Sequence, residues 1–378
     1  MFSYPPPFTP PTTEDDKLSW LRLIRSRRVG VATFYRLIDE HGSARAALLA
    51  LPEIARAAGV QGYEACPEGV ALAELKVARR LGARMLCKGA PDYPTDLAQI
   101  ADAPPVLWAL GEMAALGRPM VALVGARNAS SLGTRMARRL ADGLAAAGVT
   151  VVSGLARGVD TAAHTAALTG GTIAVMAGGV DAIYPPENAE LAAEICKTGL
   201  RLSEQPMGLE PQARHFPQRN RIISGLSLAV VVVEAAGQSG SLITARMALD
   251  QGREVFAVPG HPFDARAAGC NHLLRDGATL VRGADDILAA LALNPGASAA
   301  DGAGAAAEPP APRQPTRAWR AEAALHAKIL DRLGPSPLAE DQLLRDLAIS
   351  PAEAAPELLA LELDGRILRA PGGLLSRA

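Results

Sequence analysis

The stretch from Met120 to about Leu291 alternates between short apolar runs and amphipathic segments, and this alternation limits the folds open to the chain. The apolar runs, among them VALVG, VTVVS and AVVVV, are continuous rather than alternating in polarity. Strands buried on both faces have this pattern, and they occur in parallel sheets covered by helices on both sides. The sequence therefore predicts an α/β core with right-handed crossovers and a binding crevice at the carboxyl ends of the strands.

The rest of the 378-residue chain predicts smaller parts around this core. Residues 1–16 are rich in proline and predict a disordered or draped tail. Residues 17–110 predict a helical domain and a proline-containing connector, and the core follows over residues 111–293. Residues 294–317 consist mostly of Ala, Gly and Pro, which is typical of a flexible linker. Residues 318–378 predict three helices and a terminal hairpin, the pattern of a winged-helix domain.

Two interpretations remain for the segment RRVGVATFYRLIDEHGS in the N-terminal helical part. A helix-hairpin-helix has such a glycine turn, in which backbone N–H groups bind a DNA phosphate. A small helical packing module explains the same apolar spacing without any ligand.

The third predicted helix of the C-terminal domain carries an unexpected charge for a DNA-binding element. Over residues 351–364 it contains four acidic side chains and no Lys or Arg. A recognition helix that enters the major groove needs positive charge. We therefore expect this domain to contact protein or the rest of the chain rather than to grip DNA.

Composition sets further limits on function. The formal net charge is −1, and residues 119–290 hold 15 basic and 15 acidic residues, so a nucleic-acid site must be a local cluster. The four cysteines form no CxxC pair, which favours reduced thiols and no structural metal site. Apolar runs are shorter than the ~20 residues that span a bilayer, so we expect a cytoplasmic protein without membrane contact.

The loop VGARNASSLG after the first core strand combines small and basic residues. Gly125 lets the backbone approach a phosphate, Ser130 stands at the start of the next helix, and Arg127 can fork onto phosphate or stack on a base. The loop is not GxGxxG and lacks the acidic partner of a dinucleotide site. A phosphate or nucleic-acid contact is therefore favoured over a nicotinamide cofactor.

Two further loops follow neighbouring strands. The loop SGLARGVDTAAH contains Arg157, a possible basic contact. Its Asp160 and His164 fit two interpretations, an acid–base pair or a helix cap beside a hydrogen-bonded histidine. The second interpretation is favoured. MAGGVDAIYPPEN places Tyr184 where it can pack or stack.

The fourth stretch is FPQRNRIISGLSLAVVVVEAAGQSGSLIT. An aromatic, Phe216, precedes the donors Arg219, Asn220 and Arg221, which suggests a polymer of phosphates and bases rather than a single phosphate. We expect Arg127, Arg157, Arg214, Arg219 and Arg221 to form a basic stripe.

After the following strand, a hydroxyl-rich loop at a helix start provides Ser239, Gly240 and Ser241 as phosphate ligands. Glu234, at the end of that strand, is acidic where phosphate would bind. It fits three roles equally: capping backbone donors, orienting Arg221, or contacting a base.

Taken in order, the motifs VGARNAS, SGLARGVDTAAH, TIAVMAGGVDAIYPPEN, FPQRNRIISGLS and GCNHLLRDGA resemble the DNA-processing protein A (DprA/Smf) family. The resemblance implies an extended Rossmann-like core, a SAM-like N-terminal helical domain and a winged-helix domain. It also implies that the chain binds single-stranded DNA without sequence preference and loads a RecA-type recombinase in natural transformation and competence. A homodimer formed through the core is implied as well. The resemblance implies no catalytic activity and no cofactor. The resemblance implies that the DNA contacts include Arg127, Phe216 and residues 219–221. At the position of Ala126 the family usually has serine.

A nucleotide-processing enzyme is the rival interpretation. Phosphoribohydrolases resemble this core distantly, with a glycine–threonine phosphate loop where this chain has GQSGSLIT. Glu234 would then be a catalytic acid, although the sequence offers it no paired carboxylate.

Overall fold

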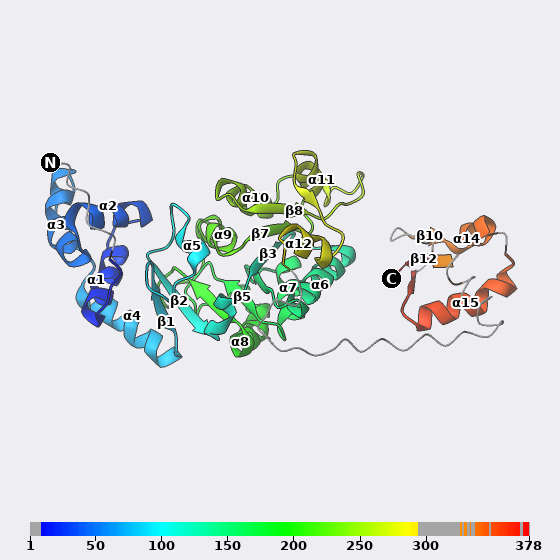
Figure 1. Cartoon of the computed structure of the whole chain (residues 1–378), viewed down its shortest axis with the longest axis horizontal. Helices are drawn as coiled ribbons and strands as arrows, with labels where there is room; N and C mark the ends of the chain where they lie inside the picture. The colour runs from blue at the N-terminus through cyan, green and yellow to red at the C-terminus, as the bar shows by residue number, and fades with distance from the viewer. Residues whose placement is uncertain are drawn as a thin grey trace, which may run out of the picture. The chain divides into compact units, whose positions relative to one another are not determined.

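The computed structural model describes residues 9–293 and, in the C-terminal part, residues 326, 329–330, 333, 337–347, 349–370 and 373–377 (Figure 1). The chain divides into two compact units, Met1–Ser298 and Ala299–Ala378. The predicted linker over residues 294–317 lies outside the described residues, as does most of the helix expected before residue 333. None of the described helices is long and apolar enough to cross a membrane.

A nine-stranded sheet forms the centre of the first unit, in the order β1-β2-β6-β5-β4-β3-β7-β8-β9. Its strands are β1 (Arg84–Cys87), β2 (Val106–Gly111), β3 (Met120–Val124), β4 (Thr150–Ser153), β5 (Thr172–Val175), β6 (Leu200–Ser203), β7 (Ala229–Val232), β8 (Glu254–Ala257) and β9 (Thr279–Leu280). The seven strands from β3 to β9 run parallel, which confirms the predicted parallel core. Their carboxyl ends therefore lie along one edge of the sheet.

The first two strands depart from the expected domain organisation. β1 and β2 pair antiparallel with each other, and β2 pairs antiparallel with β6. Residues 17–110, expected to form the N-terminal helical domain and its connector, thus contribute β1 and most of β2 to the core sheet. The prolines Pro104 and Pro105 precede β2 and do not interrupt its hydrogen bonds.

Helices cover both faces of the sheet, because alternate residues of each strand point to opposite sides. On one face, Ala122 and Val124 of β3 pack with residues from helices α5 (Thr95–Ala98), α9 (His215–Leu226), α10 (Gly240–Asp250) and α11 (Ala268–Arg275). On the other, Val121 and Leu123 pack with α6 (Ser131–Ala146), α7 (Val159–Ala167) and α12 (Ala284–Ala290), while α8 (Ala189–Thr198) covers β5. Two short 3₁₀ turns, η1 (Met113–Gly117) and η2 (Pro186–Asn188), complete the layers.

Four helices form the N-terminal part of this unit: α1 (Glu14–Arg25), α2 (Val31–His41), α3 (Ala44–Ala57) and α4 (Glu68–Leu81). Thr13 caps α1 through a reciprocal capping box with Asp16, so helix begins inside the segment that was expected to be a tail. Trp20 and Phe34 pack edge to face with ring centroids 5.1 Å apart in the small core of these helices.

The second unit has the elements of a winged helix as far as it is described. Helices α14 (Glu340–Leu347) and α15 (Pro351–Leu363) pack with a three-stranded sheet ordered β10-β12-β11. These strands are β10 (Leu338–Ala339), β11 (Ile367–Ala370) and β12 (Leu374–Arg377). Glu357 of the acidic helix pairs with His326, and Glu362 pairs with Arg369. These two acidic side chains are therefore partnered within the unit itself.

Candidate nucleic-acid interface

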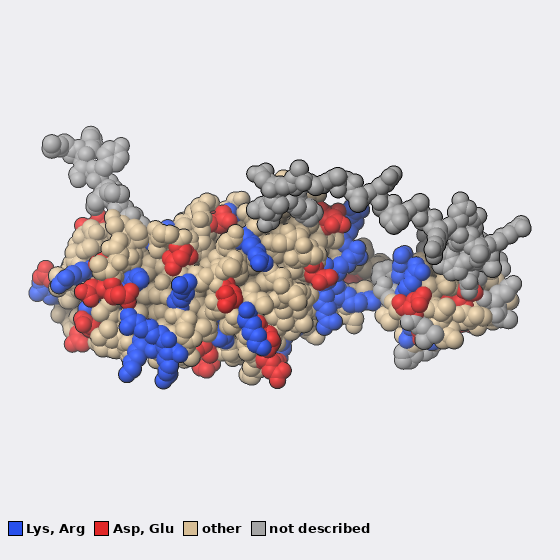
Figure 2. All heavy atoms as spheres, turned by 60° about the horizontal axis from the view of Figure 1, so that its bottom comes forward, with Lys and Arg blue, Asp and Glu red and all other residues tan. Residues whose placement is uncertain are grey.

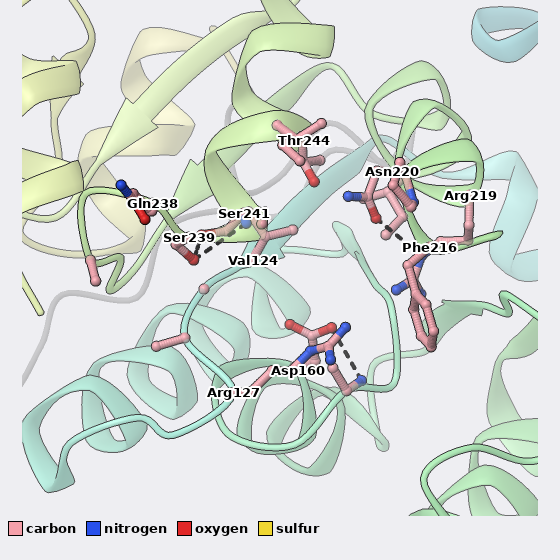
Figure 3. Close-up of a pocket in the computed structure, with 18 residues that line it drawn as sticks. Val124, Arg127, Asp160, Phe216, Arg219, Asn220, Gln238, Ser239, Ser241 and Thr244 are labelled. Atoms are coloured by element: carbon pink, nitrogen blue, oxygen red, sulfur yellow. Dashed lines mark hydrogen bonds between the residues drawn. The ribbon is translucent and has the colours of Figure 1, made fainter. Parts of the chain in front are cut away.

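A cavity of about 520 Å³ opens at the carboxyl ends of β3, β4 and β7. Figure 3 shows the labelled side chains of α9 on one side of this cavity and Ser239 and Ser241, at the start of α10, on the other. The lining residues are Val124, Gly125, Ala126, Arg127, Ala156, Asp160, Phe216, Pro217, Arg219, Asn220, Ile223, Ala236, Gln238, Ser239, Gly240, Ser241, Ile243 and Thr244. Of the eleven residues expected to contact DNA, eight line it and Ser130, Arg157 and Arg221 do not.

Helix α9 explains why the predicted run of donors separates. Residues 215–226 are helical, so side chains two positions apart point about 200° from each other. Arg219 and Asn220 line the cavity, whereas Arg221 points away from it. The sequence order Arg-Asn-Arg therefore does not give two adjacent surface arginines.

Arg219 is buried beneath the cavity, with 6% of its surface exposed. Its Nη1 donates to the carbonyl oxygens of Gly154 and Val175, at the ends of β4 and β5. Its Nε donates to Asn220 Oδ1 at 3.2 Å. Burial lowers the pKa of Arg219 to about 10, and the charge of Asp160 opposes that shift. Arg219 thus joins α9 to two strand ends and places positive potential under the cavity floor.

Asp160 fixes the loop after β4. Its Oδ2 accepts hydrogen bonds from the backbone N–H groups of Gly154 at 3.1 Å and Ala156 at 3.2 Å. Burial raises the pKa of Asp160, and the neighbouring charge of Arg219 lowers it. The side chain therefore holds backbone donors of the loop before α7. It lies in the first turn of that helix and is not its N-cap, which is Gly158, so the expected capping role is corrected to bracing of the loop.

His164 lies four residues after Asp160 on α7 and makes its own contacts. Its Nε2 accepts from the N–H of Leu155 at 3.3 Å, and its Nδ1 lies 2.8 Å from Thr172 Oγ1. Full burial lowers its pKa from the ordinary 6.5 to about 3, so the ring is neutral at physiological pH. This is the hydrogen-bonded histidine of the second interpretation, and its ring bonds to Leu155 and Thr172 rather than to Asp160.

We expect His164 to make the stability of the chain sensitive to acid. The unfolded chain protonates this ring below about pH 6.5, whereas the folded chain resists protonation until about pH 3. The free energy of unfolding should therefore fall as pH drops through this window, by at most ~1.4 kcal/mol per pH unit from this group. Urea unfolding at pH 7 and pH ~5 measures the loss, and His164→Gln should show a smaller difference between the two. An equal difference in both proteins would contradict the assignment.

Arg221 occupies a separate buried position on the far side of α9. It forms ion pairs with Glu204, after β6, and with Asp102, 3.3 Å from its Nε. Burial raises the pKa of Glu204, and Arg221 opposes this shift. Arg25 of α1 donates to the backbone oxygen of Glu204 at 3.1 Å. Arg221 therefore links α9 to the N-terminal helices and is placed as a structural residue, which corrects its expected place in a basic stripe.

An aromatic and cationic group forms the exposed edge of the cavity. The guanidinium of Arg127 lies over the ring of Phe216, 5.0 Å from its centroid. Tyr184 meets the same ring edge to face at 5.8 Å between centroids, so the loop after β5 contributes here even though it does not line the cavity. Arg127 is exposed and Phe216 half-buried, which leaves both accessible to a ligand.

Ser130 and Glu234 brace the loop that carries Arg127. The Ser130 hydroxyl caps α6 by accepting from the N–H of Gly133 at 2.9 Å, and it donates to Glu234. Glu234 also accepts from the N–H of Ser130 at 2.9 Å. The structure thus selects the first of the three roles left open for Glu234, the capping of backbone donors. Ser130 acts as a cap and does not face the cavity.

Glycines allow the loops after β3 and β4 to approach each other closely. A Cβ on Gly125 would lie 2.6 Å from Val159 Cγ2. Gly158 has a φ of 77°, and a Cβ there would lie 2.3 Å from the carbonyl oxygen of Ala126. The first and second loops therefore interlock, and the backbone of the cavity floor is set before any ligand binds.

The start of α10 forms the opposite wall. Ser239 caps the helix, with its Oγ accepting from the N–H of Ser241 at 3.4 Å and lying 2.7 Å from the Ser241 hydroxyl. A Cβ on Gly240 would meet nothing within 4 Å, so this residue leaves the helix start open. Such a helix start attracts an anion through its dipole and free N–H groups.

Arg157 lies outside the cavity. It is exposed and forms an ion pair with Glu187. Arg214 is also exposed, and its Nε donates to His215. The expected five-arginine stripe therefore reduces to Arg127 and Arg219 at the cavity. Within the described parts of the chain, no three His, Cys, Asp or Glu side chains gather in a way that could hold a metal ion.

Comparison with known proteins identifies the family. A family model described as DNA recombination-mediator protein A matches residues 84–292. The chain belongs to this family. Models of the DprA-like N-terminal HHH domain and of the DprA winged helix domain match residues 14–77 and 306–373. The resemblance drawn from the motifs is confirmed, and the helix-hairpin-helix interpretation is favoured over a plain packing module.

Individual relatives of the family agree. Protein Smf from Synechocystis is 37% identical over 315 residues, which cover 75% of this chain and 77% of the relative. The DNA processing protein DprA of Streptococcus pneumoniae is 47% identical over 199 residues, 52% of this chain and 70% of that protein. Its X-ray structure covers 73% of this chain and 96% of its own, with a TM-score of 0.59 and 36% identity. A Helicobacter pylori DprA structure, whose title concerns its single-stranded DNA binding mode, has a TM-score of 0.52 and 31% identity, covering 56% and 95% of the two chains.

Proposed function

We propose that the chain binds single-stranded DNA, without sequence preference, in the cavity between α9 and α10. The pairing of Arg127 with Phe216 at the open edge carries this proposal, because it joins a phosphate-binding cation to a stacking surface. The helix start at Gly240 supplies backbone donors on the opposite side. Single-strand binding is also the subject of the H. pylori relative's structure.

We further propose that the bound strand is handed to a RecA-type recombinase in the cytoplasm, during natural transformation or recombination, by a homodimer formed through the core. The description of the family as recombination mediators supports this extension. A sequence-independent grip suits the role, because the strand to be delivered can have any sequence.

The proposal assigns no catalytic step to the cavity. The rival phosphoribohydrolase function needs Glu234 as an acid, but that carboxylate is occupied by the hydroxyl and N–H of Ser130. Asp160 is likewise occupied by two backbone N–H groups. Incubation with nucleoside monophosphates should release no free base, and release of base would favour the rival.

Arg127→Ala provides the first test of single-strand binding. The variant should bind all sequences more weakly and lower the slope of log affinity against log salt by about 0.7, the value for one lost phosphate contact to a single strand. Fluorescence anisotropy with labelled oligonucleotides at several salt concentrations measures both quantities.

Arg80→Ala is the matched control, because Arg80 is exposed on α4 and does not line the cavity. It should leave affinity and slope nearly unchanged. A salt slope unchanged in Arg127→Ala would overturn the assignment of Arg127 to phosphate.

A further inference from the structure

Helix α6 presents three arginines on its solvent face. Arg135, Arg138 and Arg139 are spaced by three and four residues, so they share one side of the helix. The opposite side is buried in the core through Ala137, Leu140 and other apolar residues. Figure 2 shows Lys and Arg side chains gathered over the part of the core where α6 lies.

These three cations differ from Arg157 and Arg282 of the core because they form no ion pair with any described residue. Arg157 pairs with Glu187 and Arg282 with Asp286. Asp142, on the same face one turn further on, makes no ion pair with them either. In a core with equal numbers of basic and acidic residues, this face of α6 is thus a local excess of positive charge.

The arginine face begins close to the cavity. α6 starts at Ser131, directly after the loop that carries Arg127 at the cavity edge. With a rise of 1.5 Å per residue, Arg135 and Arg139 lie about 6 and 12 Å along the axis from the helix start. The three arginines therefore lie within roughly the first two and a half turns of the helix that follows Arg127.

The chemistry of this face differs from that of the cavity. α6 contains no aromatic residue, so it offers no ring on which a base can stack. Arg138 and Arg139 are exposed and Arg135 is half-buried, and guanidiniums of this kind can bind phosphate oxygens. A strand lying here would be held by its backbone alone.

We propose that a single strand engaged in the cavity continues over α6, where Arg135, Arg138 and Arg139 bind phosphates of nucleotides outside the cavity. This inference rests on the proposed function and adds a second, purely electrostatic segment to the binding site. The cavity then determines affinity for short strands, and α6 adds affinity only when the strand is long enough to reach it.

The test compares two strand lengths in a triple variant, Arg135→Gln, Arg138→Gln and Arg139→Gln. An oligothymidylate of about 2 nucleotides, short enough to be held by the cavity alone, should bind with unchanged affinity, and one of about 25 nucleotides should bind more weakly. For three lost contacts, the salt slope for the long strand should fall by about 2 and the affinity by roughly 10- to 100-fold near 0.1 M salt. An unchanged thermal unfolding midpoint will establish that the variant is folded.

A matched control removes three exposed cations elsewhere, by Lys76→Gln, Arg80→Gln and Arg84→Gln in α4 and β1. It should affect neither strand. Equal weakening of the long strand by both triple variants would overturn the inference in favour of general attraction by net charge. Unchanged long-strand binding in the α6 variant, or an equal loss for both lengths, would also overturn it.

Failure of the α6 extension and failure of single-strand binding itself give different results. If Arg127→Ala weakens both lengths and the α6 variant weakens neither, the cavity binds DNA and only the extension is wrong. If the unmodified protein binds neither length, the proposed function itself fails.

Discussion

Replacing Arg219 with methionine is expected to lower the free energy of unfolding by about 2–6 kcal/mol, because two buried carbonyl oxygens each lose their donor at about 1–3 kcal/mol. Methionine fills much of the same volume, so the loss reports mainly the missing charge and donors. Asp160 would remain buried without the cation that opposes its burial. The carbonyl oxygens of Gly154 and Val175 would lose their Nη1 donor. Urea unfolding followed by circular dichroism measures the change.

Two further variants separate this explanation from a general effect of losing an arginine. Arg157→Met removes an exposed arginine that also pairs with a carboxylate, and it should cost less than about 1 kcal/mol. Adding Asp160→Asn to Arg219→Met removes the second charge and should restore part of the stability. If the double variant is less stable than the single one, the charge of Asp160 is not the source of the cost.

The parallel core was predictable because its signal is local. A strand buried on both faces must be apolar at each position, and β3 and β7 are apolar from end to end. The loops follow the strands, so their residues could be placed at one sheet edge without knowing any side-chain position. For this reason Arg127, Phe216 and residues 239–241 were expected near one another, and the structure brings them to one cavity.

Helix α9 was not predictable in the same way. Its segment HFPQRNRIISGL buries Arg219, Arg221 and Ser224 along with its apolar residues, so hydrophobic periodicity does not outline it. These polar side chains are buried because carbonyl groups and carboxylates from distant parts of the chain partner them. Only the tertiary structure supplies those partners, and only the helix phase separates Arg219 from Arg221.

The extension of the sheet by β1 and β2 was missed for a related reason. β2 follows two prolines, and its partner β6 lies about 90 residues further along the chain. Glu234 is a similar case, because its three candidate roles depend on which loop folds onto it. The N–H and hydroxyl of Ser130, 104 residues away, decide among them.

Phe216→Ala is expected to weaken single-strand binding by about 1–3 kcal/mol, the value of stacking one base on an aromatic side chain. The salt slope should stay close to that of the unmodified protein, because no charge is removed. Anisotropy titrations at several salt concentrations measure both quantities. Phe216→Trp keeps a stacking surface and should retain most of the affinity, so an equal loss in both variants would argue against stacking.

The contact between Phe216 and Arg127 makes a sharper prediction about the pair. In the free protein the guanidinium lies over the ring face, where a base would also stack. Binding must therefore move Arg127 aside or place the base on the remaining ring surface beside Tyr184. In either case the two side chains depend on each other, and contacting residues typically couple by about 0.5–3 kcal/mol. The loss of binding free energy in the double variant Arg127→Ala with Phe216→Ala should therefore differ from the sum of the losses in the two single variants. If the losses add strictly, the cation and the ring act on separate nucleotides.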